Sequence, residues 1–324
     1  MVISCEEFQL QRRNKKGVCL DSLEIQEEGS STIITFCGNE LLYSNEIIKT
    51  TASVITLTFK SDATKHKKGF SCKYETLTTH LSEALDAHEK KQCLPASTAS
   101  CSCTSATKSD SYYVDILIPD GRLIVTSGIP NHEFEDNSKA KHSACQNRMY
   151  MVIPAKPEQG TTFTNTPMGP TGIATSGGYF YNHLSDITGT VAVVNEVLSF
   201  DSCNGHSDGK CRYHYHQIPK CLMTSQKCVH LGYMRDGFPV KSYCTKNKKS
   251  NKILKSCYKR TGNGDGSHES HYVFSEENYK SGACDLDEAN GYKFKSGYVY
   301  LFTEDYPFIP SKYLGKKVKN ICGF

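Results

Sequence analysis

The tetrapeptide Tyr213-His214-Tyr215-His216 decides how the second half of this 324-residue chain is interpreted. Two residue types alternate along it, and successive side chains of a β-strand point to opposite faces. The pattern therefore predicts a strand with both tyrosines on one face and both histidines on the other. His206 lies upstream in a turn-like Asn-Gly-His sequence. A turn histidine beside two strand histidines predicts a three-histidine site that suits zinc or copper.

Cysteine is the strongest compositional signal. The chain has 16 cysteines, mostly without the spacing of zinc ligands, and this predicts disulfides in a secreted, extracellular protein. The sequence shows neither a signal peptide nor an apolar run that could span a membrane, so we expect an incomplete or processed amino terminus. The net charge of +4, without a basic stripe interleaved with aromatic residues, argues against nucleic-acid binding.

Residues 1–77 are predicted to form a β-sandwich domain. Four short runs rich in Ile, Thr, Phe and Val, separated by turn residues, are its candidate strands: Ser22–Ile25, Ser31–Phe36, Val54–Phe59 and Phe70–Tyr74. The region resembles a CUB domain in four segments: residues 19–25, 36–38, 57–62 and 68–75. The resemblance implies a jelly-roll-like sandwich and a Cys19–Cys37 disulfide. It covers only the later part of the family's length, so we expect the first strands to lie upstream of Met1.

The CUB resemblance also implies a calcium site. Asp21 and Asp62 stand at the family's two aspartate positions, and carboxylate oxygens are what Ca²⁺ prefers. Gln11 replaces the upstream glutamate, and this loses a charge. Solvated loop carboxylates are the alternative interpretation. Cys5 and Cys72 lie outside the family pattern and could pair with each other.

Residues 78–110 are predicted to be a linker, and residues 111–324 a second, β-rich and loop-rich domain. Leu81–Lys91 could form a short amphipathic helix, and a Ser/Thr-rich stretch follows it. The linker contains three cysteines that could staple it: Cys93, Cys101 and Cys103. Strand candidates in the second domain include Tyr112–Ile118, Arg122–Thr126, Val191–Leu198 and Tyr298–Phe302.

The second domain contains an internal duplication, roughly 165–221 and 228–309. Residues 200–206 align with 286–292, and Tyr213-His214-Tyr215-His216 aligns with Tyr298-Val299-Tyr300-Leu301. Both copies keep the tyrosines and the Asn-Gly turn, so the tyrosine face is interpreted as structural. Tyr292, Val299 and Leu301 replace the three histidines in the second copy. Histidines that are present together in one copy and absent together in the other are typical of a single site.

A lysine-rich insertion distinguishes the second copy. Five of its lysines form a candidate surface for an anionic glycan or matrix partner: Lys246, Lys248, Lys249, Lys252 and Lys255. A solvated loop is the simpler interpretation. Cys244 and Cys257 bracket the insertion, and a bond between them would make it a stapled loop.

The second domain closely resembles the YHYH domain family. The resemblance rests on residues 128–132, 203–206, 213–216 with 219 and 221, 232 with 236–239, 286–288 with 290–291, and 306–307. It implies a β-rich extracellular module without a settled activity, and a Cys203–Cys221 disulfide. In many members the later repeat also contains histidines, whereas here it does not.

The predicted metal site comprises His206, His214 and His216, with His132 as a candidate fourth ligand and Asp236 as a carboxylate that would orient a histidine. A hydrogen-bonded histidine network is the alternative. His183 is expected at the surface, and His268 with His271 is a weaker metal candidate. We predict an extracellular interaction or matrix module carrying a divalent metal. The alternatives are a zinc or copper enzyme centred on the same histidines and a purely structural adhesion module.

Overall fold

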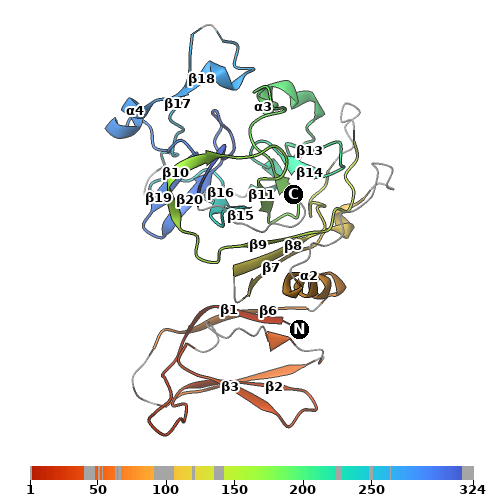
Figure 1. The fold of residues 1–324 in the computed structure, drawn as a ribbon, viewed down its shortest axis with the longest axis vertical. Coiled ribbons are helices and arrows are strands. Elements are labelled where there is room, and N and C mark those ends of the chain that lie inside the picture. The colour runs from red at the N-terminus through yellow and green to blue at the C-terminus, as the bar shows by residue number, and fades with distance from the viewer. Residues whose placement is uncertain are drawn as a thin grey trace. The chain divides into compact units, whose positions relative to one another are not determined.

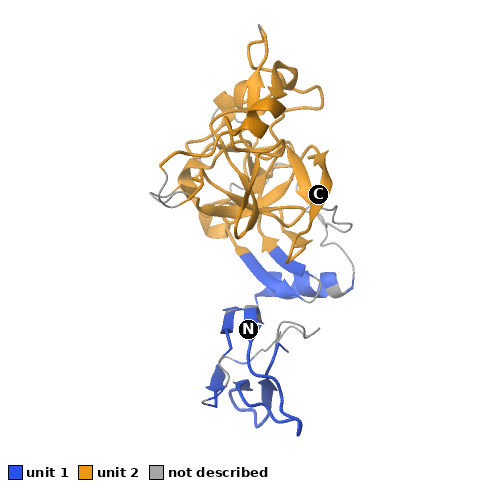
Figure 2. Cartoon of the chain, turned by 90° about the vertical axis from the view of Figure 1, so that its left-hand side faces the viewer, with its two compact units in different colours: residues 1–92, 114–124 blue, residues 93–113, 125–324 orange. Residues whose placement is uncertain are grey.

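A computed structural model of the chain shows a mainly β protein, as predicted (Figure 1). The structure describes residues 2–39, 48–49, 52, 54–62, 64, 67–76, 78–90, 106–118, 121–134, 142–223, 228–247, 251–262 and 264–315. Two compact units divide the chain: residues 1–92 with 114–124, and residues 93–113 with 125–324 (Figure 2). The three linker cysteines and two of the patch lysines, Lys248 and Lys249, lie outside the described residues.

The first unit contains a β-sandwich of two three-stranded antiparallel sheets, ordered β4-β1-β6 and β3-β2-β5. Its elements are β1 (Val2–Gln9), β2 (Ser22–Glu27), β3 (Ile33–Phe36), β4 (Ile48–Lys49), β5 (Ile55–Lys60), β6 (Gly69–Glu75) and helix α2 (Thr79–Glu89). Phe8 from one sheet and Leu23 from the other share a buried core. Alternating apolar residues on both sheets therefore close the sandwich, and α2 forms where the sequence predicts a short helix.

Residues 113–315 form several smaller sheets besides a large one. A three-stranded sheet has the order β7-β8-β9, and two-stranded sheets pair β10 with β21 and β17 with β18. Their bounds are β7 (Tyr113–Ile118), β8 (Gly121–Thr126), β9 (Met149–Ile153), β10 (Gln159–Asn165), β17 (Tyr258–Arg260), β18 (Tyr272–Phe274) and β21 (Lys312–Gly315). The helical segments are η1 (Lys108–Asp110), α3 (Ala192–Asn195), η2 (Val197–Ser199), η3 (Lys220–Leu222), η4 (Glu269–His271) and α4 (Glu276–Ser281).

The prediction of a strand over Val191–Leu198 is wrong, because α3 and η2 occupy this stretch. The backbone N–H groups of Asn195 and Glu196 donate to the carbonyls of Val191 and Ala192, as in a helical turn. Val191 and Ala192 are buried, whereas most of the following apolar side chains are exposed. A run of β-branched residues favours a strand only when its side chains pack on a sheet, and these do not.

The main sheet of the second unit has eight strands in the order β13-β14-β12-β11-β15-β16-β20-β19. Its strands are β11 (Gly172–Ala174), β12 (Tyr179–Phe180), β13 (Gly205–Ser207), β14 (Tyr213–Tyr215), β15 (His230–Met234), β16 (Pro239–Lys241), β19 (Gly291–Phe294) and β20 (Gly297–Leu301). In the first half, β12 pairs parallel with β14, and in the second half β16 pairs parallel with β20. The two halves meet where β11 pairs antiparallel with β15. Each half therefore consists of two hairpins joined by one parallel pair.

The same hydrogen bonds recur in both halves. The Asp201 carboxylate accepts from the N–H groups of Cys203 and Gly205 and from the Tyr213 hydroxyl, at 2.6 Å. In the second half, Asp287 accepts from Ala289, Gly291 and Tyr298 in the same way. Asn204 and Asn290 both have positive φ angles, 68° and 60°, which asparagine tolerates well. Each aspartate thus fixes a tight turn to the strand that follows it.

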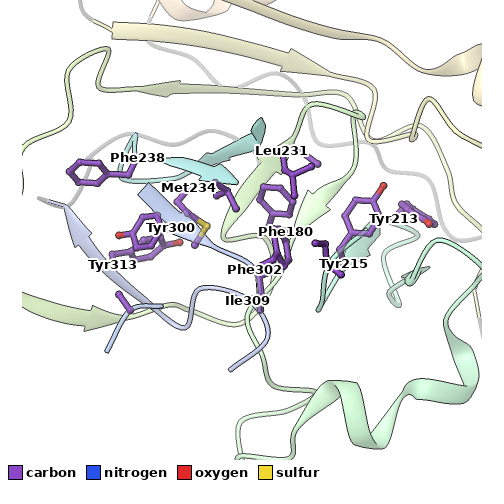
Figure 3. Close-up of a cluster of buried hydrophobic side chains, with 14 of the residues drawn as sticks. Phe180, Tyr213, Tyr215, Leu231, Met234, Phe238, Tyr300, Phe302, Ile309 and Tyr313 are labelled. Carbon is purple, nitrogen blue, oxygen red and sulfur yellow. The ribbon is translucent and has the colours of Figure 1, made fainter. Parts of the chain in front are cut away.

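A single hydrophobic core spans both halves of the main sheet. Phe180 and Phe302 meet edge to face at a ring-centroid distance of 5.5 Å. Tyr213, Tyr215 and Tyr300 belong to the same buried cluster (Figure 3). The tyrosines on the opening motif and its counterpart are therefore core residues, and their hydroxyls are hydrogen-bonded, as buried hydroxyls usually are.

Disulfides join five cysteine pairs among the described residues: Cys5–Cys72, Cys19–Cys37, Cys203–Cys221, Cys228–Cys244 and Cys257–Cys284. The first three match the predicted pairings. The predicted Cys244–Cys257 bond is wrong.

The reason lies in strand pairing. The antiparallel β15–β16 hairpin brings the N–H of Cys228 to the carbonyl of Tyr243, beside Cys244. The N–H groups of Asp285 and Leu286 bond to the carbonyl of Lys255, and this places Cys284 beside Cys257. Each cysteine therefore has a tertiary neighbour closer than the one that its place along the insertion suggests.

Candidate metal centre

Three histidines converge on one side of the main sheet. His206 on β13 lies directly opposite His214 on β14, and His216 directly follows β14 on the same face as His214. The ring nitrogens of the three that could bind a metal lie within 4.8 Å of one another. The hairpin register, set by the Asp201 turn, therefore assembles the predicted three-histidine cluster.

Neighbouring oxygen atoms fix the proton positions on all three rings. The Nδ1 atoms of His214 and His216 lie 2.9 Å and 2.6 Å from the carbonyl oxygens of Arg212 and Asn182. A carbonyl only accepts hydrogen bonds, so both Nδ1 atoms carry the proton and both Nε2 atoms are bare. The Ser199 hydroxyl donates to the carbonyl of Glu196 and therefore accepts from Nδ1 of His206, at 2.8 Å.

The bare nitrogens point at one another. Nε2 of His214 lies 3.0 Å from Nε2 of His216, and neither carries a proton for the other to accept. Nε2 of His206 is buried without a hydrogen-bond partner among the described residues. Two imidazole lone pairs at this distance repel each other, and this pattern needs a cation between them to become favourable.

Glu196 lies beside two of the three histidines, although the sequence alone did not single it out. Its Oε2 atom lies 3.4 Å from Nε2 of His206 and 3.3 Å from Nε2 of His216. This oxygen is also buried without a hydrogen-bond partner among the described residues. Glu196 was missed because the stretch was interpreted as a strand. The available signal was a lone carboxylate in an otherwise apolar run just upstream of His206.

Burial and neighbouring charges set the protonation of these groups. Burial lowers the pKa of His216 to about 4 and lowers the pKa of His214 well below its ordinary value. Burial alone would raise the pKa of Glu196, but His206 and His216 lower it by more, so the pKa of this carboxyl lies below its ordinary value. Near neutral pH the cluster thus holds neutral His214 and His216 beside the Glu196 carboxylate, and these are the forms that bind metal.

Aromatic rings hold the imidazoles in place. Tyr181 stacks on His214 with ring centroids 3.7 Å apart and an interplanar angle of 17°. Its hydroxyl donates to Asp208, which also pairs with Arg212. Phe200 meets the ring of His206 edge-on at 4.8 Å. The site is therefore built on packed side chains whose rotamers are already fixed.

His132 does not belong to this site, so its prediction as a fourth ligand is wrong. Its Nδ1 lies 2.7 Å from the carbonyl of Glu133, and its Nε2 lies 2.5 Å from the hydroxyl of Tyr215 and 3.4 Å from the Cys203 sulfur. Tyr215 points to the opposite face of β14 from His214. Side-chain alternation along the strand therefore separates His132 from the three histidines.

The prediction that Asp236 orients a histidine of the metal site is also wrong. Its carboxylate accepts from the Tyr300 hydroxyl in the second half, at 2.6 Å, and from the N–H of Gly315 on β21, at 2.9 Å. Burial raises the pKa of this carboxyl. Tyr300 corresponds to Tyr215, whose hydroxyl meets Ser176 in the first half. Asp236 therefore supports the structural tyrosine face of the duplicate rather than a histidine.

The equivalent position in the second half is filled by apolar side chains. Val299 and Leu301 pack with Leu254 and Leu286 in a separate buried cluster, and Tyr292 lies against it. Strand pairing sets Tyr292 opposite Val299, as it sets His206 opposite His214. The scaffold therefore folds around either a hydrophobic cluster or a histidine cluster at this place.

Three further predictions from the sequence concern the calcium site at Asp21 and the positions of His183 and His268. In the first unit, Asp21 accepts from the hydroxyl of Ser61 and the N–H of Asp62, so calcium binding there stays a prediction. His183 is buried, with Glu269 at 3.7 Å, so its expected surface position is wrong. His268 points its Nε2 at the carbonyl of Thr188, at 2.6 Å.

The lysine insertion is partly neutralised where it is described. Lys246 forms an ion pair with Asp285 at 2.7 Å, and the backbone N–H of Lys255 donates to the same carboxylate. Lys252 is exposed. Binding of an anionic partner at this insertion therefore stays a prediction.

We expect the metal-free protein to lose stability as the pH falls from about 6.5 toward 4. Burial lowers the pKa of His216 to about 4 in the folded chain, from the ordinary histidine value of 6.5 in an unfolded chain. Because the folded pKa is the lower one, the stability from neutral His216 is present above pH 6.5 and is lost on acidification. The loss should reach roughly 3 kcal/mol. Urea unfolding in chelator across this pH range measures it, and an equally steep dependence in His216→Leu would contradict it.

A disulfide-linked β-sandwich and a β-sheet domain of two similar halves, one with a buried histidine cluster, define the class of this protein. A protein-family model described as YHYH protein matches residues 150–315, just over half of the chain. A CUB domain model matches residues 1–74. The chain belongs to the YHYH family and carries a CUB domain before its YHYH domain. No curated protein and no solved structure matches it.

The CUB domain and the five disulfides fit an extracellular interaction module. Within the described part of the chain, no helix has the length and apolar character needed to cross a membrane.

Proposed function

We propose that the YHYH domain binds one divalent transition metal through His206, His214, His216 and Glu196, and that the metal fixes the surface of an extracellular interaction module. The observation that carries this proposal is the 3.0 Å approach of two bare Nε2 atoms whose Nδ1 protons are committed to carbonyls. A hydrogen-bonded network, the alternative from the sequence, would need a proton between those nitrogens and has none to place there.

Two donor-atom separations support a tetrahedral ion, and the 3.0 Å between Nε2 of His214 and His216 is shorter than the tetrahedral value. Four ligands at about 2.0–2.1 Å from a tetrahedral metal lie about 3.3–3.4 Å from one another. The distances from Glu196 Oε2 to Nε2 of His206 and His216 are 3.4 Å and 3.3 Å. Three imidazoles and one carboxylate suit zinc first, and copper is the alternative.

The donor set favours a structural metal over a catalytic one. Catalytic zinc sites keep a position open for water or substrate, whereas structural sites use four protein ligands. Here a protein oxygen faces two of the three nitrogens, those of His206 and His216, and Oε2 of Glu196 and Nε2 of His206 are both shielded from solvent. The metal would then hold the η2 segment against the sheet and shape the surface that a protein or anionic glycan partner meets.

Elemental analysis of protein purified without added metal tests the proposal. We expect close to one equivalent of zinc or copper, and a lower melting temperature after a chelator removes it. Metal content well below one equivalent, with no uptake on adding zinc or copper, would contradict the proposal. Uptake that survives Glu196→Gln unchanged would leave a three-histidine site with an open position, and would revive the enzyme alternative.

A further inference from the structure

A second cluster of metal-ligating side chains lies on the tyrosine face of β14. His132, Cys203 and Cys221 each offer one ligand atom, and these atoms lie within 4.8 Å of one another. Cys203 and Cys221 are bonded as a disulfide, so the sulfur atoms are not available as ligands in this state. The cluster is separate from the three-histidine site and plays no part in the proposed function.

The imidazole of His132 is oriented toward the disulfide. Its Nδ1 faces the carbonyl of Glu133 and carries the proton, so the bare Nε2 is the atom that lies 3.4 Å from the Cys203 sulfur. A histidine that donates Nδ1–H to a carbonyl and presents Nε2 is the usual arrangement of a metal ligand. The same arrangement recurs in His214 and His216.

The two sulfur atoms differ in environment. Cys203 is fully buried, and its sulfur accepts from the N–H of Cys221 at 3.1 Å. Cys221 is exposed, and it is the only exposed cysteine among the twelve that the structure describes. Disulfide reduction requires access to a sulfur atom, so a thiol reagent should reach this bond before the other four described.

We propose that reduction of Cys203–Cys221 creates a second metal site, with both thiolates and Nε2 of His132 as ligands to a soft divalent ion such as zinc. A dithiol is the reductant. It donates two electrons and two protons, its own sulfurs form a disulfide, and Cys203 and Cys221 become thiols. Metal binding then displaces the two thiol protons to solvent. Two thiolates and an imidazole are the donor types that zinc selects.

Tyr215 must give up its hydrogen bond to His132 for this site to form. Its hydroxyl lies 2.5 Å from Nε2 of His132, and the same hydroxyl lies 3.1 Å from Oγ of Ser176. When Nε2 binds the metal, the Tyr215 proton can turn to Ser176. The buried Tyr215 hydroxyl therefore keeps a partner in both states.

Cobalt titration of the full chain tests the proposal, because thiolate ligation to Co²⁺ gives intense near-ultraviolet absorption that a histidine and carboxylate site does not. After limited treatment with a dithiol, mass spectrometry of alkylated protein should find Cys203 and Cys221 modified first. Cobalt should then add one equivalent with thiolate absorption, beyond any bound before reduction. We expect Cys221→Ser to abolish this absorption and His132→Gln to weaken cobalt binding at least tenfold. His88→Gln is the matched control and should change nothing.

Three results would overturn the proposal: another disulfide reduced first, no thiolate absorption once Cys203 and Cys221 are reduced, or His132→Gln binding like the unaltered chain. If Cys221→Ser fails to fold, alkylation of Cys221 before titration provides the same test. Failure here leaves the three-histidine site untouched, because that site binds without reduction and without sulfur.

Discussion

Replacing His206, His214 and His216 with Tyr, Val and Leu should abolish metal binding while the domain still folds. These are the residues at the matching positions of the second half, Tyr292, Val299 and Leu301, where they belong to or lie against a buried cluster. The same scaffold therefore already accommodates them. We expect metal content to fall from about one equivalent to none, with the circular dichroism spectrum retained.

The effect of a chelator on stability tests whether the metal bound at these histidines stabilises the fold. For a ligand at 100 to 1,000 times its dissociation constant, the stabilisation amounts to about 2.7–4.1 kcal/mol. We therefore expect a chelator to destabilise the unaltered protein by roughly this amount and to leave the triple variant unaffected. The matched control is His142→Ala, which removes a histidine outside the cluster. Equal chelator sensitivity in the triple variant would show that the metal binds elsewhere.

Asp201→Ala should destabilise the second unit by roughly 3–5 kcal/mol, because it leaves three hydrogen-bond donors without their acceptor. The N–H groups of Cys203 and Gly205 and the buried Tyr213 hydroxyl all lose their acceptor. Chemical denaturation measures the loss. Asp305→Ala, at an exposed aspartate, is the control and should cost little.

The duplicate provides a sharper comparison. Asp287→Ala removes the same three hydrogen bonds in the second half and should destabilise by a similar amount. Only Asp201→Ala should also weaken metal binding, because its turn sets the register that places His206 opposite His214. If both variants weaken metal binding alike, the turn has no specific part in building the site and acts only through global stability.

Much of the metal centre could be predicted from three histidines and one repeat. Alternation in residues 213–216 placed His214 and His216 on one face, and comparison with the second copy selected His206 as their companion. Glu196 could not be found in this way, because a helical turn carries it to the histidines. His132 was misassigned because the sequence does not state which face of β14 its loop approaches.

The disulfides show the same limit to what could be predicted from the sequence. Cys19–Cys37 and Cys203–Cys221 followed from family resemblance, whereas Cys244 and Cys257 were paired because they bracket one insertion. In the folded chain each bonds to a cysteine brought close by backbone hydrogen bonds to another segment. Proximity along a loop is a weak guide when a hairpin or a neighbouring strand offers a shorter distance.

By itself, the sequence determined the β architecture, the two similar halves and the division of Tyr213-His214-Tyr215-His216 into a structural face and a site face. Those features are local, because strand alternation and turn residues act over a few positions. Only the tertiary structure decided which groups join the histidines: Glu196 joined them, and His132 and Asp236 did not. Membership of a site depends on contacts between segments far apart in the chain, and these are fixed by strand order, register and core packing rather than by any residue's immediate neighbours.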